Sequence, residues 1–435
     1  MVVFVFLPWN RLSPFITSFL LLLTINQVEA QPALLIKAGK MYDAENRRFL
    51  TNQEILVRGN IIVKVGTRIR APKETKILSL PRSTVTPGLM DMHTHLLMHQ
   101  RQTDGLEVYS KVPAEERLRQ ALAFAKEHLL VGITTIRDLG NSGQYLDIRL
   151  QDRLKEGKTP APRLFVSGPI ISPPRGQFGQ LSPSDTFLIH QEYQVIRGTA
   201  AASAAVEQHA ERGVDVIKVC VNTDNGTLSS EEIQAIVKTA RSKGVPVTAH
   251  ATNDASARKA VLAGVDGIEH GYALSDTTLQ LMARRGTYLV PTDVSRQKAL
   301  LLVASSNIKE EEKLAYANDF LKNTRDRLKR AVEKGVMIVS GADNYNDIAT
   351  ISRGHGAKDV LLAYYEAGIP VADVLGFATQ HAAKALGLGS TLGILKKGMK
   401  ADITIFEGDL EKDFAKTLFS VQWVIKDGIL YHPNN

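Results

Sequence analysis

From residue 85 onward, short apolar runs alternate with longer stretches that have a helical period. The eight apolar runs are 85–95, 132–137, 164–171, 214–221, 245–250, 267–270, 287–291 and 336–340. This alternation is typical of repeated βα units around a parallel sheet. Eight such units can close on themselves, so the sequence predicts an α/β protein built as a (β/α)8 barrel (TIM barrel). The chemistry of such a barrel lies at the carboxyl ends of its strands.

The stretches between the runs carry helix signals. Leu118, Ala125 and Leu129 lie on one face at helical spacing, which predicts a helix packed on the sheet. Ser229 and Glu232 form a capping box that opens another helix before the fifth run. These boundaries agree with the predicted alternation of strands and helices.

The two ends of the chain have a different pattern. β-rich runs precede the barrel at 34–42, 54–58 and 61–65, and a predicted helix at 371–388 leads to β-type sequence at 393–432. Because chain termini often lie close together, we expect the late strands to complete the N-terminal β module. The predicted domains are a β module with its N-terminal part at 31–85, a barrel at 86–391, and the C-terminal part of the β module at 392–435.

The first thirty residues predict a secretory signal peptide. Arg11 precedes an apolar stretch at 15–25, and small residues at Val28 and Ala30 fit a cleavage site. The apolar centre is about 11 residues long, whereas a spanning helix needs roughly 20. We therefore expect a secreted or periplasmic protein with no transmembrane segment in the mature chain. The alternative interpretation is an uncleaved N-terminal anchor.

The composition places the chain among ordinary globular proteins, with 44% hydrophobic and 23% charged residues. Its 53 Lys and Arg residues exceed its 45 Asp and Glu residues by 8, but they form no long basic run. Nucleic acid is therefore not expected as a partner. The single cysteine, Cys220, excludes an intrachain disulfide. The composition leaves the oligomeric state open and is compatible with a homo-oligomer.

Two histidines end the first barrel strand, in the segment Pro87-Gly88-Leu89-Met90-Asp91-Met92-His93-Thr94-His95. Side chains two residues apart on a strand point the same way, so His93 and His95 should both face the barrel interior. Two convergent imidazoles are suited to a divalent transition metal.

Further polar residues follow other apolar runs at their carboxyl ends. They are Lys218, His250, His270 and Asp343. An isolated buried lysine or aspartate would be costly, so we expect compensating partners at this end of the barrel. A structural ion pair between Lys218 and Asp343 is the alternative, but it would leave the four histidines unexplained.

With these motifs the sequence resembles the amidohydrolase superfamily, in particular its imidazolonepropionase-related branch. The resemblance runs from about residue 34 to 432. It is carried by the motifs already quoted, together with Gly267-Ile268-Glu269-His270-Gly271, Ser340-Gly341-Ala342-Asp343, Gly398 and Ala401-Asp402. The resemblance implies a distorted (β/α)8 barrel, a small β-sandwich domain formed by both chain termini, and a pair of divalent ions.

The resemblance also implies roles for the strand-end residues. His93, His95 and Asp343 would hold one ion, and His250 and His270 the other. Lys218 would bridge the two ions as a carbamate formed with CO2. Imidazole and carboxylate ligands suit zinc. A hydroxide bridging the ions would attack a carbonyl, while Asp343 transfers the proton to the leaving nitrogen.

Departures from family patterns narrow the expected reaction. Asn253 stands three residues after His250, where deaminase-type members and imidazolonepropionase itself carry a catalytic glutamate, so deamination is disfavoured. Dipeptidase-like members carry a carbonyl-polarising histidine after strand three and a carboxylate-binding tyrosine after strand four. Here we align Gln177 and Leu228 with those positions, which argues against dipeptide substrates.

The sequence therefore predicts a metal-dependent amidohydrolase that cleaves an amide or cyclic amide bond of a small molecule. An Xaa-Pro or Xaa-Arg dipeptidase is the alternative, and a lactonase, an esterase or a non-catalytic scaffold is less favoured. Gln177, Tyr272 and His355 are the candidate substrate-binding residues, with His355 expected in a loop over the barrel mouth. His128 and His209, in predicted helices beside charged residues, are expected to be solvated.

Overall fold

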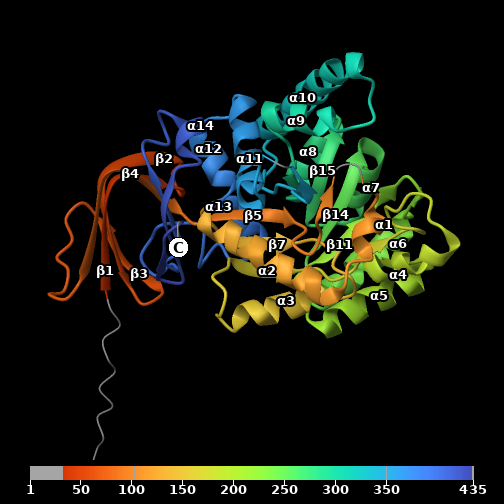
Figure 1. Ribbon diagram of the computed structural model, residues 1–435, viewed down its shortest axis with the longest axis horizontal. Helices are drawn as coiled ribbons and strands as arrows, with labels where there is room; N and C mark the ends of the chain where they lie inside the picture. Colours follow the sequence, from red (N-terminus) through yellow and green to blue (C-terminus); the bar gives the residue numbers. More distant parts are fainter. Residues whose placement is uncertain (1–32, 102–103, 349, 434–435) are drawn as a thin grey trace, which may run out of the picture. The chain divides into compact units, whose positions relative to one another are not determined.

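The computed structural model describes residues 33–101, 104–348 and 350–433 (Figure 1). The predicted signal peptide at residues 1–30 lies outside the described residues. None of the described helices combines the length and the apolar character that a membrane span requires.

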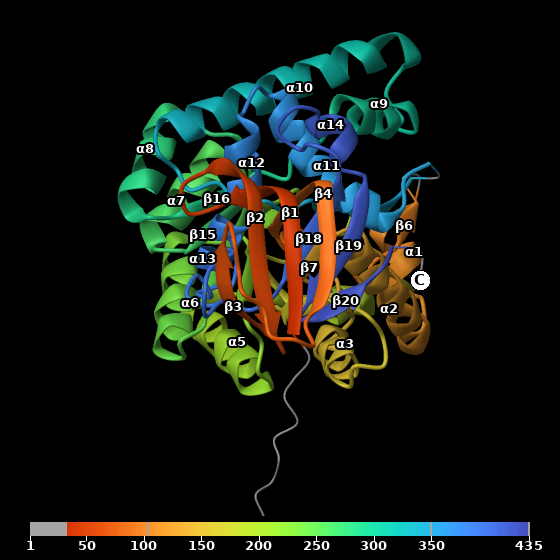
Figure 2. The ribbon, with the colours of Figure 1, turned by 90° about the vertical axis from the view of Figure 1, so that its left-hand side faces the viewer.

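Strands from both ends of the chain form one seven-stranded sheet, in the order β20-β19-β18-β4-β1-β2-β3 (Figure 2). The strands are β1 Ala33–Asp43, β2 Arg48–Arg58, β3 Ile61–Gly66, β4 Lys76–Pro87, β18 Ile403–Glu407, β19 Val421–Lys426 and β20 Ile429–Tyr431. The N-terminal and C-terminal strands meet where β4 pairs antiparallel with β18. Both termini therefore contribute to one sheet, as expected, while a sandwich of two packed sheets stays a prediction.

The apolar runs of the barrel form parallel strands. They are β5 Leu89–Thr94, β7 Ile133–Asp138, β8 Arg163–Val166, β9 Ile170–Ser172, β11 Ile217–Cys220, β14 Val247–Asn253, β15 Gly267–Ala273 and β16 Tyr288–Val290. Three of them form a sheet in the order β5-β7-β8, and the others join the short strand β10 (Tyr193–Val195) in the order β10-β9-β11-β14-β15-β16. The eighth predicted run makes only an isolated parallel bridge, between Ile338 and Leu289.

Backbone hydrogen bonds place this eighth run between β16 and β5. The amide of Val339 donates to the carbonyl of Leu289 at 2.9 Å, and the amide of Met92 donates to the carbonyl of Ser340 at 2.9 Å. The two sheets are also linked between β8 and β11, where the amide of Val216 donates to the carbonyl of Val166 at 3.3 Å. The fold is therefore α/β and TIM-barrel-like, and full closure into eight paired strands stays a prediction.

Helices lie outside the strands, with their apolar faces buried (Figure 1). The longer ones are α2 Ala114–Leu130, α3 Leu146–Lys155, α5 Gly198–Arg212, α6 Ser230–Ser242, α7 Asp254–Ala263, α8 Asp276–Arg285, α10 Glu310–Glu333 and α11 Arg353–Glu366. The predicted capping box is confirmed at α6, where Ser229 Oγ accepts from the amide of Glu232 at 3.1 Å and Glu232 Oε2 accepts from the amide of Ser229 at 2.8 Å.

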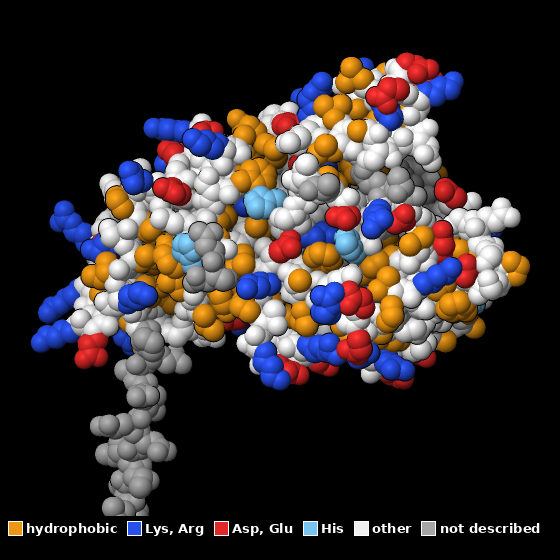
Figure 3. Space-filling view, in the orientation of Figure 1, with side chains coloured by type: hydrophobic (Ala, Val, Ile, Leu, Met, Phe, Trp, Pro, Cys, Tyr) orange, Lys and Arg blue, Asp and Glu red, His pale blue; other side chains and the backbone are white. Residues whose placement is uncertain are grey.

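The outer surface of the helices is mixed in charge. Over α2 and α3, Figure 3 shows basic side chains among acidic ones. Glu115 of α2, for example, accepts from both Arg149 and Arg153 of α3, at 2.5 and 2.8 Å. Such exposed pairs contribute little to stability.

Shorter elements lie between the main ones. They are β6 Gln100–Arg101, α1 Leu106–Ser110, a 3-10 turn at Pro183–Asp185, α4 Phe187–Glu192, β12 Asn222–Thr223, β13 Gly226–Thr227, α9 Arg296–Ala304, β17 Asn346–Asp347 and α14 Phe414–Thr417. β6 pairs with β17, and β12 pairs with β13 as a small hairpin.

The prediction of a single helix at 371–388 is wrong. The structure has two short helices, α12 Val371–Phe377 and α13 Gln380–Ala385, because Thr379 leaves the helical conformation with φ −131° and ψ −90°. The carbonyl of Ala378 accepts instead from the amide of Met90 on β5, at 2.8 Å. A tertiary hydrogen bond to a barrel strand therefore accompanies the break.

Arg163 links the barrel to the terminal sheet. Its guanidinium donates to Asp402 at 3.1 Å and to Asp427 at 2.9 Å. Asp402 is buried, and its other oxygen accepts from the amide of Asp427 at 2.8 Å. Nearby, Thr404 Oγ1 donates to the carbonyl of Gly132 at 2.7 Å. The junction is thus polar and hydrogen-bonded.

Arg163→Met should lower the free energy of unfolding by about 2 kcal/mol, because it leaves the buried Asp402 carboxylate without its cation. Urea denaturation of the purified protein measures this change. Lys158→Met is the matched control, since Lys158 forms only an exposed pair with Glu156 and should alter stability by less than about 0.5 kcal/mol. Equal effects of the two substitutions would contradict a structural role for the junction.

Candidate functional site

The first two predicted ligands face the same way. His93 and His95 lie at the end of β5, both are buried, and their ring centroids are 5.2 Å apart. The expectation from the period of two along the strand is therefore confirmed.

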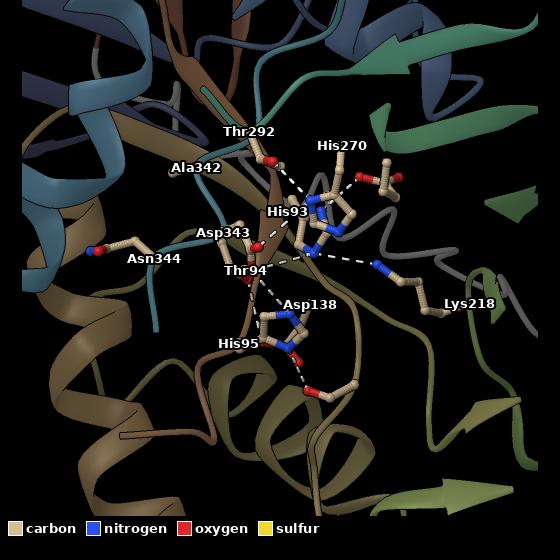
Figure 4. A network of polar contacts seen from close by, with 12 residues as sticks. His93, Thr94, His95, Asp138, Lys218, His270, Thr292, Ala342, Asp343 and Asn344 are labelled. Atoms are coloured by element: carbon tan, nitrogen blue, oxygen red, sulfur yellow. Dashed lines mark hydrogen bonds and ion pairs between the residues drawn. The ribbon is translucent and has the colours of Figure 1, made fainter. Parts of the chain in front are cut away.

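Three other predicted strand-end residues converge on the same place, namely Lys218, His270 and Asp343 (Figure 4). His250 lies beside His270. Lys218 Nζ lies 3.3 Å from His93 Nε2. The ring of His270 lies 5.1 Å from the ring of His93 and 4.6 Å from that of His250, measured between centroids. Asp343 Oδ1 lies 3.3 Å from His95 Nε2 and 3.6 Å from His93 Nε2. All six residues thus form one cluster.

Two members of the cluster have a left-handed backbone. φ is +69° at His270 and +47° at Asp343, a region that residues other than glycine seldom adopt. At His270 this conformation breaks the alternation of β15. Consecutive side chains can then reach the same neighbour: Glu269 bonds the His93 ring, and the His270 ring lies against it. Such strained positions often occur at functional sites.

Glu269 supports the cluster, although no role was predicted for it. Its carboxylate accepts from His93 Nδ1 at 2.7 Å, from Arg137 at 2.6 Å, and from the hydroxyl of Thr248. All four residues are buried. Because His93 donates through Nδ1, its Nε2 is left free to bind a metal, as is common for metal-binding histidines.

Two other histidines are oriented in the same manner. His95 Nδ1 donates to the carbonyl of Gly140 at 2.8 Å, and His270 Nδ1 lies 2.8 Å from the hydroxyl of Thr292. Sequence reasoning missed these partners because they come from loops. The one sequence signal for a residue that orients a ligand was Glu269, because it directly precedes His270 in the same motif.

Charge and burial shift the titration of the cluster. Burial alone would raise the pKa of Asp343, but the nearby His93, His95 and Lys218 lower it to about 2. Burial lowers the pKa of Lys218, only partly opposed by Glu269. The result is an ionised carboxylate beside an amine that loses its proton more readily than a solvated lysine.

The donor set fits a metal ion. Ligand atoms of His93, His95 and Asp343 all lie within 4.8 Å of one another. Asp343 Oδ1 is buried and makes no hydrogen bond in the described part of the protein. A buried carboxylate oxygen without a donor, facing two imidazole nitrogens, is the arrangement that a divalent cation would complete.

The cluster opens into a cavity of about 650 Å³. Among the described residues it is lined by His95, Met98, Gln100, Gly105, Leu106, Glu107, Asn141, Ile170, Gln177, Gly179, Gln180, Tyr193, Lys218, Asn222, Thr223, Asp224, His250, Thr252, His270, Tyr272, Asp343 and Tyr345. The candidate substrate residues Gln177 and Tyr272 are on this wall. The cavity has the size of a small-molecule site.

The orientation of Gln177 is fixed by two neighbours. Asn141 Nδ2 donates to the hydroxyl of Tyr193 at 3.2 Å, and that hydroxyl donates to Gln177 Oε1 at 3.1 Å. With its oxygen engaged, Gln177 retains its amide N–H groups for a further acceptor. It can therefore donate a neutral hydrogen bond within the cavity.

The expected position of His355 is wrong. His355 does not line the cavity and does not lie in a loop. Ser352 caps helix α11, accepting from the amide of His355 at 3.3 Å, and the exposed imidazole stacks on Phe419 at 5.9 Å between centroids. The helix begins two residues before His355 and carries it away from the strand-end cluster.

Three other expectations also need correction. Leu228 is buried in the core and does not line the cavity, so it carries no information about substrate. His128 and His209 are buried rather than solvated. His128 Nδ1 donates to the carbonyl of Phe124, and His209 Nε2 to that of Pro169, both at 2.7 Å. These hydrogen bonds let each histidine occupy a core position.

The chain is similar to known proteins over most of its length. The model of the amidohydrolase family matches residues 84–430. An uncharacterised protein of Mycobacterium tuberculosis is 28% identical over 310 residues, which cover 70% of this chain and 74% of that protein. An imidazolonepropionase of Treponema denticola is 25% identical over 384 residues, covering 81% and 85% of the two chains.

A solved structure has the same fold. It is an Xaa-Pro dipeptidase with methionine bound in its active site, 28% identical, with a TM-score of 0.79. The match covers 92% of this chain and 100% of that chain.

Glu269→Gln should lower the free energy of unfolding of the metal-free protein by about 3 kcal/mol, because the buried Arg137 loses its counter-charge. Urea denaturation followed by circular dichroism measures the change. Glu116→Gln, which removes an exposed pair with Arg119, is the control and should cost less than about 0.5 kcal/mol. A Glu269→Gln protein as stable as the control would show that the buried network does not stabilise the fold.

Proposed function

This chain belongs to the amidohydrolase family and is a hydrolase, and we propose that it uses divalent metal ions to cleave an amide or cyclic amide bond of a small molecule. The observation that carries the proposal is the convergence of four histidines, Lys218 and Asp343 at one end of the barrel strands. Four imidazoles, one carboxylate and one lysine at the same place support a site for two ions.

In this proposal His93, His95 and Asp343 hold one ion, and His250 and His270 hold the other. The ions are zinc, because imidazole and carboxylate ligands suit it. Lys218, as a carbamate, would be a ligand shared by the two ions. Bound ions of this kind supply an activated water molecule and polarise the substrate carbonyl.

The chain's own residues perform the remaining steps. Asp343 accepts a proton from the attacking water and returns it to the leaving nitrogen, a role suited to a carboxylate that is ionised at neutral pH. Gln177 donates a hydrogen bond to the substrate, with its side chain oriented by Tyr193. Tyr272, whose hydroxyl lies 3.4 Å from His270 Nδ1, lines the cavity beside the cluster and limits the space at the reacting carbonyl.

Burial supplies the physical reason for a carbamate on Lys218. A buried lysine is deprotonated more easily, and its neutral amine can form a bond to the carbon of CO2 while releasing a proton. The product is an anion with two oxygen ligands. It replaces a cation that would be repelled by bound metal ions.

A dipeptidase is the second candidate, favoured by the likeness to a solved Xaa-Pro dipeptidase. An Xaa-Arg dipeptidase belongs to the same alternative. The cavity offers little to the free carboxylate of a dipeptide, because Lys218 is the one lysine or arginine among its described lining residues. We therefore favour an amide without a free carboxylate. Ester or lactone hydrolysis and a non-catalytic scaffold have no specific observation in their favour.

The proposal includes the cellular location. The apolar stretch at 15–25 and the small residues at Val28 and Ala30 support export as a secreted or periplasmic enzyme. N-terminal sequencing of the mature protein from its native host tests this directly, with a new N-terminus near residue 31 as the expected result.

The purified protein should contain two zinc ions per chain, and a chelator should abolish its hydrolysis of a panel of N-acyl amino acids and cyclic amides. Elemental analysis and rate measurements before and after chelation provide the test. Cys220→Ser is the control, since Cys220 is buried in an apolar cluster and should not change the zinc content. An active enzyme without a transition metal, indifferent to chelators, would rule out the proposal.

Lys218→Ala should reduce turnover by about 100-fold or more, because the ions lose their bridging ligand. Short carboxylic acids with excess zinc should restore part of the activity. NMR after exposure to ¹³C-labelled CO2 should reveal a carbamate signal that disappears in Lys218→Ala. Lys358→Met, which alters another buried lysine outside the cavity, should retain that signal. Persistence of the signal in Lys218→Ala would place the carbamate elsewhere.

Xaa-Pro dipeptides should be poorer substrates than matched N-acyl amides that lack a free carboxylate. A charged group without a hydrogen-bonding partner costs about 1.5–3 kcal/mol, which corresponds to roughly one to two orders of magnitude in kcat/KM. Measuring kcat/KM for both series, including Xaa-Arg dipeptides, decides between the two candidates. If the dipeptides are hydrolysed faster, the enzyme is a dipeptidase.

A further inference from the structure

The wall of the cavity carries two carboxylates outside the candidate metal site. Glu107 lies on α1, and Asp224 lies at the turn between β12 and β13. In the part of the chain that the structure describes, neither has a hydrogen-bond or ion-pair partner. They differ in this from Glu269, whose carboxylate is bonded to His93 and Arg137.

The turn that carries Asp224 is anchored on both sides. Asn225 Nδ2 donates to the carbonyls of Gly176 and Phe178, at 2.9 and 2.8 Å. Asn222 exchanges two hydrogen bonds with Thr252, at 2.8 and 3.1 Å. The backbone at Asp224 is therefore tied to the loop after β9 and to the end of β14.

Helix α1 is also attached to its surroundings. Leu106 packs against an apolar cluster that contains Phe178, Leu188 and Tyr193. Gln191 Nε2 donates to the carbonyl of Ser110 at 2.5 Å. Both carboxylates are thus carried by anchored elements and line the cavity, Glu107 half-buried and Asp224 exposed.

Lys218 is the one lysine or arginine on the described wall, and it lies within the strand-end cluster, beside His93. No other basic side chain there offsets the charges of Glu107 and Asp224. Cations on the neighbouring loops are engaged elsewhere. Arg175 donates to the carbonyl of Gly179 at 2.5 Å, and Lys259 donates to that of Leu228 at 2.8 Å. Arg101 is exposed and does not line the cavity.

A binding surface selects groups of opposite charge and repels those of like charge. We propose that the substrate carries an ammonium or guanidinium group several bonds from its scissile carbonyl, and that Glu107 and Asp224 bind this group. The inference rests on the proposed function, whose substrate class it specifies. The cationic end pairs with the wall carboxylates, while the carbonyl end lies at the strand-end cluster. Substrates with an acidic group at the same place are repelled.

Three compounds that differ in one side chain test the inference. The variable side chain is that of lysine, norleucine or glutamate. Each compound is made both as a free dipeptide and as an N-acetyl amide. In each series the variable side chain is placed once on the acyl side and once on the amine side of the scissile bond. The zinc-loaded enzyme should hydrolyse the lysine compound with a kcat/KM about 10-fold above that of the norleucine compound, and the glutamate compound least well. This advantage should shrink as salt is raised from about 0.05 to about 0.5 M.

Glu107→Gln and Asp224→Asn should each lower kcat/KM for the lysine compound by about 5-fold, and for the norleucine compound by less than about 2-fold. Asp319→Asn is the control, because Asp319 is exposed on α10 away from the cavity wall, and it should change neither value. Equal rates for lysine and norleucine, a preference for glutamate, or variants that behave like the control would overturn the inference.

Failure of the proposed function gives a different result, namely no hydrolysis of any compound by the zinc-loaded protein. In that case calorimetry with the lysine and norleucine compounds decides the inference alone. Tighter binding of the lysine compound that is lost in the Glu107→Gln/Asp224→Asn double variant would support it. Equal binding of both compounds would reject it.

Discussion

The guanidinium of Arg137 on β7 contacts three other elements of the barrel. It donates to the carbonyl of Met92 on β5 at 2.7 Å, to the hydroxyl of Tyr288 on β16 at 2.7 Å, and to Glu269 on β15 at 2.6 Å. Glu269 in turn holds the ring of His93. Because an unpaired buried charge is far more costly than a paired one, neither Arg137 nor Glu269 can move without the other. The position of the functional cluster therefore depends on Arg137, which does not line the cavity.

Much of the fold and of the candidate site could be predicted from the sequence because both follow from periodicity. Parallel strands end at one edge, so the polar residues after each apolar run had to meet there, and His93, His95, Lys218, His250 and Asp343 do so. Glu269 was missed for a physical reason. Its approach to His93 accompanies the left-handed backbone at His270, and a pattern of alternating residues carries no information about such a local exception.

The errors have another cause, which is that hydrogen bonds satisfy side chains and end helices in ways that the residue pattern does not indicate, at His209 and Ala378 through contacts distant in the chain and at His128 and His355 through local ones. His128 and His209 stand beside charged residues, yet each finds a backbone carbonyl that satisfies it in the core. The hydrogen bond from Met90 to Ala378 lies where a continuous apolar helix was predicted. His355 was assigned to a loop because a capping serine was not recognised in the sequence before it. None of these partners is close to its target in the chain, apart from Phe124 and Ser352.

The terminal sheet has a consequence for the order in which the chain can fold. Strand β4 pairs with β1 on one side and with β18 on the other, and about 315 residues separate β4 from β18. During synthesis or export from the N-terminus, the β18 side of β4 stays an open edge until the last strands emerge. The barrel must therefore form while that edge is still able to pair with another chain. A truncation before residue 403 would leave the edge permanently open.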